Sequence, residues 1–143
     1  MTANIISIGN ELLIGDTINS NAAWIGEYLS DLGFEVKRIY TISDEAEEIK
    51  DAITECIKSS DLVICTGGLG PTNDDISKKA VAELFDSKLI LHEATLQYIR
   101  KIFAERNIPF SDSNYDQAMV PDKCDVLFNR AGTAPGMWFE TRD

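Results

Sequence analysis

Short apolar runs alternate with amphipathic stretches along the first half of the chain. Residues 4–8 and 62–65 are short apolar runs of strand length, and residues 35–42 are predicted as the strand between them. Between them, residues 21–32 and a second stretch that ends near residue 59 repeat apolar positions at the spacing of one helix face. This alternation predicts an α/β fold whose parallel strands are joined by crossover helices.

The second half of the chain is less regular. We expect the following elements after residue 75: a helix, a short strand at 88–91, a helix at 93–106, a short helix at 113–119 and strands at 125–128 and 137–141. The 143 residues show no repeat and no interdomain linker. A chain of this length is near the commonest domain size, so we expect a single domain over residues 1–143.

The charge balance excludes some classes of partner. Asp and Glu number 24 against 13 Lys and Arg, and the formal net charge is −11. Without a basic cluster, binding to nucleic acid or to an anionic membrane is disfavoured. An acidic protein that binds a phosphorylated ligand must offset charge, either with backbone N–H groups at a helix start or with a divalent cation.

The location of the protein is predicted from what the sequence lacks. No stretch is apolar and long enough to span a membrane, and the N-terminus has no secretory pattern. The three cysteines form no C-x-x-C pair, which is typical of a reduced compartment. We therefore expect a cytoplasmic protein.

A glycine-rich loop follows the third apolar run, with the sequence T-G-G-L-G-P-T-N-D-D over residues 66–75. Three glycines in four positions permit positive φ angles and a close approach of the backbone to a ligand. The loop is neither a dinucleotide fingerprint nor a Walker loop. Ligands of open α/β sheets bind at the carboxyl ends of the strands, where strand order reverses, so we expect the first and third strands to be neighbours with the ligand beside them.

The last two residues of this loop, Asp74 and Asp75, admit two interpretations. In the first interpretation, one of them is an ordinary helix N-cap. Alternatively, the pair holds a divalent metal or activates water beside a pyrophosphate. One residue can also serve as the cap while the other binds the ligand.

A second loop follows the first strand, over residues 9–21, and it ends at the same edge of the expected sheet. Glu11 is a candidate third acidic group for the site. Asn19 or Asn21 is expected to cap the first long helix, and a role in ligand binding is the alternative.

Three motifs together resemble the N-terminal domain of CinA-like proteins: G-N-E-L-L with Gly15 and Asn19, the glycine-rich loop, and G-T-A-P-G over residues 132–136. That domain belongs to the wider molybdopterin-binding superfamily of MoaB and MogA. The resemblance covers essentially the whole chain. It implies a three-layer α/β/α sandwich with a mostly parallel sheet, and self-association into a homo-oligomer.

The resemblance also implies an activity. CinA-like members are associated with metal-dependent hydrolysis of ADP-ribose to AMP and ribose 5-phosphate, whereas MogA-like members adenylylate molybdopterin. Where this chain has Asp74, the MogA-like loop has arginine, which favours the hydrolase. The expected ligand is thus a small phosphorylated molecule, of ADP-ribose or pterin type, with Mg, Mn or Co as cofactor. A non-catalytic binding or oligomerisation module is the third hypothesis.

The site residues that these observations and the resemblance imply fall into two groups. Asp74 and Asp75 are the expected catalytic residues and metal ligands. The expected ligand-binding residues are Gly9, Asn10, Glu11, Gly15, Asn19, Thr66, Gly67, Gly68, Gly70, Thr72, Gly132 and Thr133. Two departures from the family pattern are Ser77, where threonine is usual, and the end of the sequence at Asp143, so we expect the domain to lack its C-terminal end.

Overall fold

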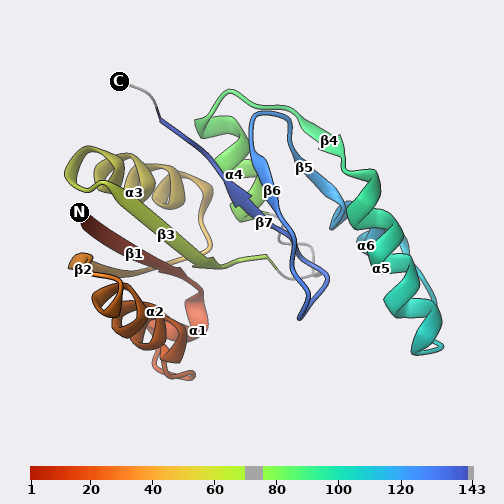
Figure 1. Cartoon of the computed structure of the whole chain (residues 1–143), viewed down its shortest axis with the longest axis horizontal. Coiled ribbons are helices and arrows are strands. Elements are labelled where there is room, and N and C mark those ends of the chain that lie inside the picture. The colour runs from red at the N-terminus through yellow and green to blue at the C-terminus, as the bar shows by residue number, and fades with distance from the viewer. Residues whose placement is uncertain (70–75, 142–143) are drawn as a thin grey trace. The chain divides into compact units, whose positions relative to one another are not determined.

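Three parallel strands form the sheet of the first part of the chain. In the computed structural model, which describes residues 1–69 and 76–141, the protein divides into two compact units, Met1–Leu69 and Gly70–Asp143. The strands of the first unit are β1 (Thr2–Ile8), β2 (Glu35–Ile42) and β3 (Leu62–Gly67), in the order β2-β1-β3 (Figure 1). The central strand β1 is buried along nearly its whole length, which explains its alanine and three isoleucines.

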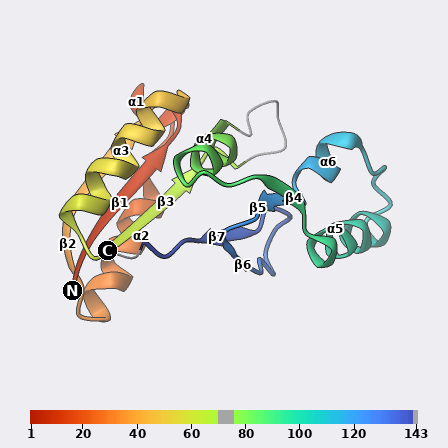
Figure 2. The same ribbon diagram turned by 90° about the horizontal axis from the view of Figure 1, so that it is seen from above.

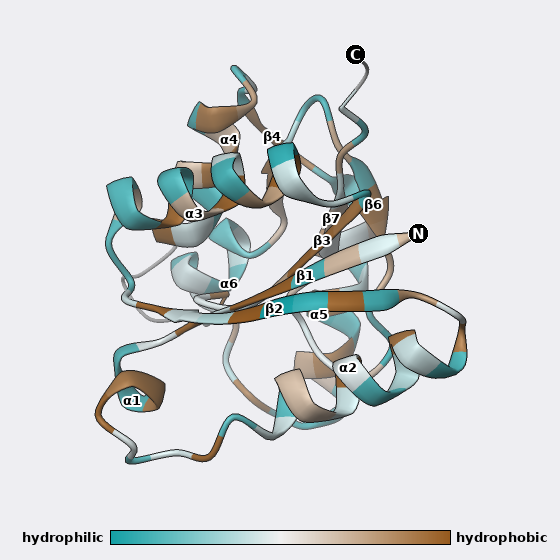
Figure 3. Ribbon diagram, turned by 90° about the vertical axis from the view of Figure 1, so that its left-hand side faces the viewer, coloured by the Kyte–Doolittle hydropathy of each residue, from teal (hydrophilic) through white to brown (hydrophobic). Residues whose placement is uncertain are grey.

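Helices cover both faces of this sheet. Helix α2 (Ser20–Asp31) lies against one face and α3 (Ala46–Ser59) against the other (Figure 3). On the α2 side, Ile5 packs in a buried cluster with Ala22 and Leu29. On the other side, α3 contributes its own buried residues, Ile49, Ile53 and Cys56. The first unit is thus three layers, α/β/α, and the predicted fold class is confirmed.

The loop after β1 contains a short helix that the sequence did not predict. Helix α1 spans Asn10–Leu13. It ends in a Schellman motif, in which the Gly15 N–H donates to Leu12 O (3.3 Å) and the Asp16 N–H donates to Glu11 O (3.0 Å). Gly15 takes a φ of +77° to close this motif, a conformation that favours glycine.

The second unit combines short helices with two antiparallel strand pairs. Its elements are α4 (Ile76–Leu84), β4 (Leu89–Leu91), α5 (Glu93–Glu105), α6 (Asp112–Asp116), β5 (Met119–Pro121), β6 (Asp125–Leu127) and β7 (Gly136–Trp138). β4 pairs with β5, and β6 pairs with β7 (Figure 2). Leu96 and Ile99 of α5 pack with Ala118 to form the core of this unit.

One predicted element was wrong in part. The helix expected at residues 113–119 is α6, which ends at Asp116, and the chain then enters strand β5. Met119 pairs with Leu91 of β4, so a partner distant in the sequence determines the conformation there. The prediction of a single domain over the whole chain stays a prediction. No helix in the described residues is long and apolar enough to cross a membrane.

Candidate functional site

The carboxyl ends of the three parallel strands meet at one edge of the first unit. Ile8 of β1 pairs with Ile42 of β2 and with Gly67 of β3. The Gly9 N–H donates to Ile42 O at 3.0 Å, so the chain leaves β1 beside the end of β2. Since β2 and β3 flank β1 on opposite sides, strand order reverses at β1. The two predicted ligand loops therefore leave neighbouring strands at a topological switch point, as expected.

Gly67 occupies a position that no other residue fits. Its φ is +99°, and Gly68 follows with a φ of +64°. A Cβ on Gly67 would overlap the carbonyl oxygen of Ile8 and lie 3.0 Å from its carbonyl carbon. The obstacle is backbone of the neighbouring strand, which cannot move aside without breaking the sheet. The glycine-rich loop thus begins with a turn that depends on a missing side chain.

The remaining loop residues predicted to act in the site are Gly70, Thr72, Asp74 and Asp75, and all four lie outside the described residues. Their roles stay predictions. Helix α4, nine residues long, begins at Ile76, directly after the acidic pair. In its first turn Ser77 is buried, and the buried Lys78 donates from Nζ to Asp116 O at 2.9 Å. The first turn of α4 is therefore held to the rest of the second unit by this hydrogen bond.

Asn19 is the N-cap of α2, which settles one of the two alternatives for this residue. Its Oδ1 accepts from the Ala22 N–H and from the Ser7 hydroxyl, each at 3.2 Å. Its Nδ2 lies 3.5 Å from Thr41 Oγ1, to which it donates. Both ends of the side chain are thus engaged within the first unit, and a ligand-binding role for Asn19 stays a prediction.

Ser7 and Thr41 are site neighbours that the sequence interpretation missed. The strand register places Ser7 beside Thr41 on one side and beside Thr66 on the other. Three hydroxyl side chains therefore form a row across the sheet near its carboxyl edge, where Asn19 binds two of them. The available signal was a serine inside a largely apolar strand, a polar residue that needs a partner when buried.

Replacing Asn19 with alanine is expected to lower the free energy of unfolding by about 1–2 kcal/mol. The change removes the cap of α2 and leaves the Ser7 hydroxyl, which is fully buried, without this partner. Urea denaturation followed by circular dichroism measures the loss. Asn21→Ala is the matched control because Asn21 is exposed and makes no cap, so it should change the stability little. An equal loss in both variants would contradict the assignment of the cap.

Glu11 and its neighbours lie in the short helix at the end of β1. Glu11 is exposed, and its carboxylate lies so close to Gly9 that a Cβ on that glycine would collide with it. Asn10 is also exposed, and Gly15 serves the end of α1. This places one carboxylate at the strand end next to Gly67. Ligand binding by these four residues stays a prediction.

Gly132 and Thr133 belong to the second unit, in the loop between β6 and β7. Asn129 holds this loop, because its Nδ2 donates to Ala134 O and its Oδ1 accepts from the Ala131 N–H, both at 2.9 Å. A Cβ on Gly132 would lie 3.0 Å from Asn129 Nδ2, so the glycine fits a tight turn. The loop is ordered by its own contacts, and its predicted role in binding stays a prediction.

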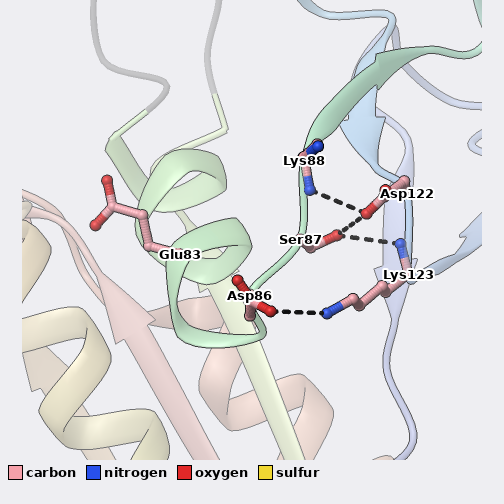
Figure 4. Close-up of a pocket in the computed structure, with 6 residues that line it drawn as sticks. All are labelled: Glu83, Asp86, Ser87, Lys88, Asp122 and Lys123. Atoms are coloured by element: carbon pink, nitrogen blue, oxygen red, sulfur yellow. Dashed lines mark hydrogen bonds and ion pairs between the residues drawn. The ribbon is translucent and has the colours of Figure 1, made fainter.

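The second unit also contains a polar hollow of about 520 Å³ (Figure 4). Its lining residues are Glu83, Asp86, Ser87, Lys88, Asp122 and Lys123. Asp122 accepts from the Ser87 hydroxyl (2.7 Å) and the Lys88 backbone N–H (2.9 Å), and these two donors lower the pKa of its carboxyl group. Lys123 pairs with Asp86 at 3.4 Å. Because these groups largely satisfy one another and no predicted site residue lines the hollow, it is not the candidate site.

A metal ion in the candidate site would depend on the acidic pair. Within residues 1–69 and 76–141, no three or more His, Cys, Asp or Glu side chains gather as a metal site. Asp74 and Asp75 supply carboxylate oxygens, the ligand type that Mg²⁺ and Mn²⁺ prefer. The chemistry of this donor set fits a hard divalent cation.

Comparison with known proteins supports the resemblance drawn from the motifs. The chain is 44% identical over 138 residues to a CinA-like protein of Cytophaga hutchinsonii, a match that covers 96% of this chain but 33% of that protein. A solved structure of CinA from Thermoplasma acidophilum is 35% identical, with a TM-score of 0.84, and the match covers 95% of this chain and 79% of that one.

More distant structures share the fold. The tungsten cofactor synthesizing protein MoaB from Pyrococcus furiosus has a TM-score of 0.55 at 23% identity, over 84% of this chain and 78% of that one. The family model described as a probable molybdopterin binding domain matches residues 4–142. Since this match spans nearly the whole chain and the relatives with high identity are CinA-like, the protein belongs to the family of probable molybdopterin binding domains, in its CinA-like branch.

Proposed function

We propose that this domain is a metal-dependent pyrophosphohydrolase that cleaves ADP-ribose into AMP and ribose 5-phosphate. The observation that carries the proposal is the adjacent pair Asp74 and Asp75, placed directly before α4 on a loop that leaves the switch point of the sheet through Gly67 and Gly68. The CinA-like relatives are about three times as long as this chain, so an activity of the whole relative is carried here only as part of the proposal.

The pyrophosphate would bind to the backbone of the glycine-rich loop. Gly67, Gly68 and Gly70 carry no side chain that would keep a ligand from the loop backbone, and Thr72 would add a hydroxyl. The N-terminus of α4 would add the partial positive charge of a helix start. These groups attract an anion to a protein whose net charge is −11.

The acidic pair would hold the cation. When bound, a divalent cation neutralises charge on the pyrophosphate and lowers the pKa of a water molecule, which makes that water a nucleophile at neutral pH. Asp74 and Asp75 would bind the cation and orient it toward the pyrophosphate. The loop N–H groups would stabilise the charge that develops at phosphorus. Glu11, exposed at the neighbouring strand end, is the carboxylate that would accept the proton of the attacking water.

The direct test is to incubate the purified chain with ADP-ribose and to separate the products by chromatography. We expect AMP and ribose 5-phosphate in equal amounts with Mg²⁺, Mn²⁺ or Co²⁺, and neither product when the metals are removed with EDTA. If no metal supports the reaction while ADP-ribose still binds in calorimetry, the domain is a non-catalytic binding module and the proposal is wrong.

A second candidate function is binding of molybdopterin, with or without adenylyl transfer. The family description names molybdopterin binding, and that favours a pterin phosphate as the ligand of the same loop. Asp74 argues against the transfer reaction, because a carboxylate there repels the phosphates that an arginine would attract. Tight binding of molybdopterin without turnover of ADP-ribose would place this candidate first.

A further inference from the structure

Ser77 carries a buried hydroxyl group that the fold does not use. The residue is the second of α4, and only 3% of its surface is exposed. Within residues 1–69 and 76–141, its Oγ has no hydrogen-bond partner. A hydroxyl buried in this way is destabilising, because the hydrogen bond to water that it loses on folding is not replaced. The hydroxyl therefore lowers the stability of the folded chain, which indicates a role outside the fold.

Ser87, in the same unit, shows the ordinary use of a serine hydroxyl. It donates to Asp122 Oδ1 at 2.7 Å and accepts from the Lys123 backbone N–H at 3.1 Å. This hydroxyl joins two segments that lie far apart in the sequence. The hydroxyl of Ser77 joins nothing in the part of the chain that the structure describes.

The position of Ser77 in its helix places the hydroxyl at the start of α4. Along an α-helix the Cα–Cβ bonds tilt toward the N-terminus. Since the side chain is short and Ser77 is the second of the nine residues of α4, its Oγ lies beside the first turn. The first N–H groups of a helix have no partner within that helix, and together with the helix dipole they favour an anion. The Ser77 O–H is one more donor in the same place.

The next residue adds positive charge to this turn. Lys78 is 5% exposed, and its Nζ donates to Asp116 O at 2.9 Å, so the ammonium group is held inside the second unit. A buried charge is screened less by salt than an exposed one and acts over a longer distance. The helix dipole and this charge have the same sign. Both favour an anion beside Ser77 over a cation bound by its oxygen.

We propose that the Ser77 hydroxyl donates a hydrogen bond to a phosphate oxygen of the ligand at the N-terminus of α4. The inference rests on the proposed function in one respect, that the ligand carries phosphate groups bound with a divalent cation beside the acidic pair. It holds whether the rest of that ligand is ADP-ribose or a pterin. The hydroxyl has already lost its contact with water in the free chain, so binding gives it a partner without further desolvation.

Ser77→Ala separates this role from a structural one. Without ligand, the variant should be at least as stable as the wild type in urea denaturation, because the change removes an unpartnered polar group from the interior. Ser87→Ala is the matched control and should be less stable than the wild type, since it breaks two hydrogen bonds. If Ser77→Ala were clearly less stable than the wild type, the hydroxyl would belong to the fold and the proposal would be wrong.

Binding is measured with inorganic pyrophosphate as the probe, by calorimetry at a fixed excess of Mg²⁺. This probe carries phosphate groups and does not require that ADP-ribose is the substrate. Ser77→Ala should bind it at least about tenfold more weakly than the wild type, the effect of losing one hydrogen bond to a charged group. Ser77→Thr keeps the hydroxyl and should bind like the wild type, and so should Ser87→Ala.

The outcomes distinguish this inference from the proposed function. If the chain does not cleave ADP-ribose but the variants bind pyrophosphate as expected, only the hydrolase is wrong. If the chain cleaves ADP-ribose while Ser77→Ala binds pyrophosphate as tightly as the wild type, only the inference is wrong. The inference also fails if the wild-type chain does not bind pyrophosphate. It fails equally if Ser77→Ala reaches the wild-type affinity when more Mg²⁺ is added, because the hydroxyl would then bind the cation.

Discussion

Replacing Gly67 with alanine is expected to lower the free energy of unfolding by about 3 kcal/mol or more. The methyl group would overlap the carbonyl oxygen of Ile8 in the neighbouring strand, and the backbone at this residue has a φ of +99°. The strands cannot move apart to make room for the methyl group, because Ile8 and Gly67 are paired in the register of β1 and β3. Urea denaturation monitored by circular dichroism measures the loss.

Gly33→Ala is the matched control for this prediction. Gly33 also has a positive φ, +83°, but no atom lies within 4 Å of the position of its Cβ. The control therefore carries only the conformational cost of a left-handed residue, about 1–2 kcal/mol. If the two variants lost the same stability, steric overlap with Ile8 would not be the reason for glycine at position 67.

The regular first unit was predictable because its sequence repeats one simple pattern. The run predicted at residues 35–42 is strand β2, Glu35–Ile42. The short apolar run at residues 4–8 predicted a strand, which is β1, and the structure places a neighbouring strand on each side of it. The order β2-β1-β3 then follows from the rules for parallel crossovers, which restrict where consecutive strands can lie.

The features that were missed depend on contacts distant in the sequence. Residues 119–121 form a strand because β4 supplies hydrogen-bond partners, and a local pattern cannot reveal that. Asn19 and Asn21 were equivalent candidates for the cap. Asn19 is distinguished by its hydrogen bonds to Ser7 and Thr41, which lie on two different strands. Propensity and spacing do not contain such information, since they describe neighbours along the chain.

In the candidate site, too, some features were predictable from the local sequence and others were not. The glycines of the glycine-rich loop were predicted to permit positive φ angles, and Gly67 and Gly68 have them. The loop edge at the carboxyl ends of β1 and β3 was also predicted, and the register confirms it. The roles of Asp74 and Asp75 rest on their residue type and on their place before α4, so a functional measurement must decide them.

Asp75→Asn is expected to reduce metal-dependent formation of AMP from ADP-ribose at least about a hundredfold. Asparagine keeps the size of the side chain and one oxygen, but it loses the negative charge that a divalent cation requires. The stability of the fold should change little, because asparagine caps a helix about as well as aspartate does. Rates measured over a series of Mn²⁺ concentrations separate weaker metal binding from slower chemistry, since only weaker binding is overcome by more metal.

Asp74→Asn and Asp51→Asn complete this experiment. The Asp74 variant should also lose activity, whereas Asp51 is exposed on α3 and its variant should match the wild type. If Asp75→Asn kept full activity while Asp74→Asn lost it, Asp75 would be the helix cap and Asp74 the metal ligand. If both variants kept full activity, the acidic pair would have no part in catalysis and the hydrolase proposal would lose the observation on which it rests.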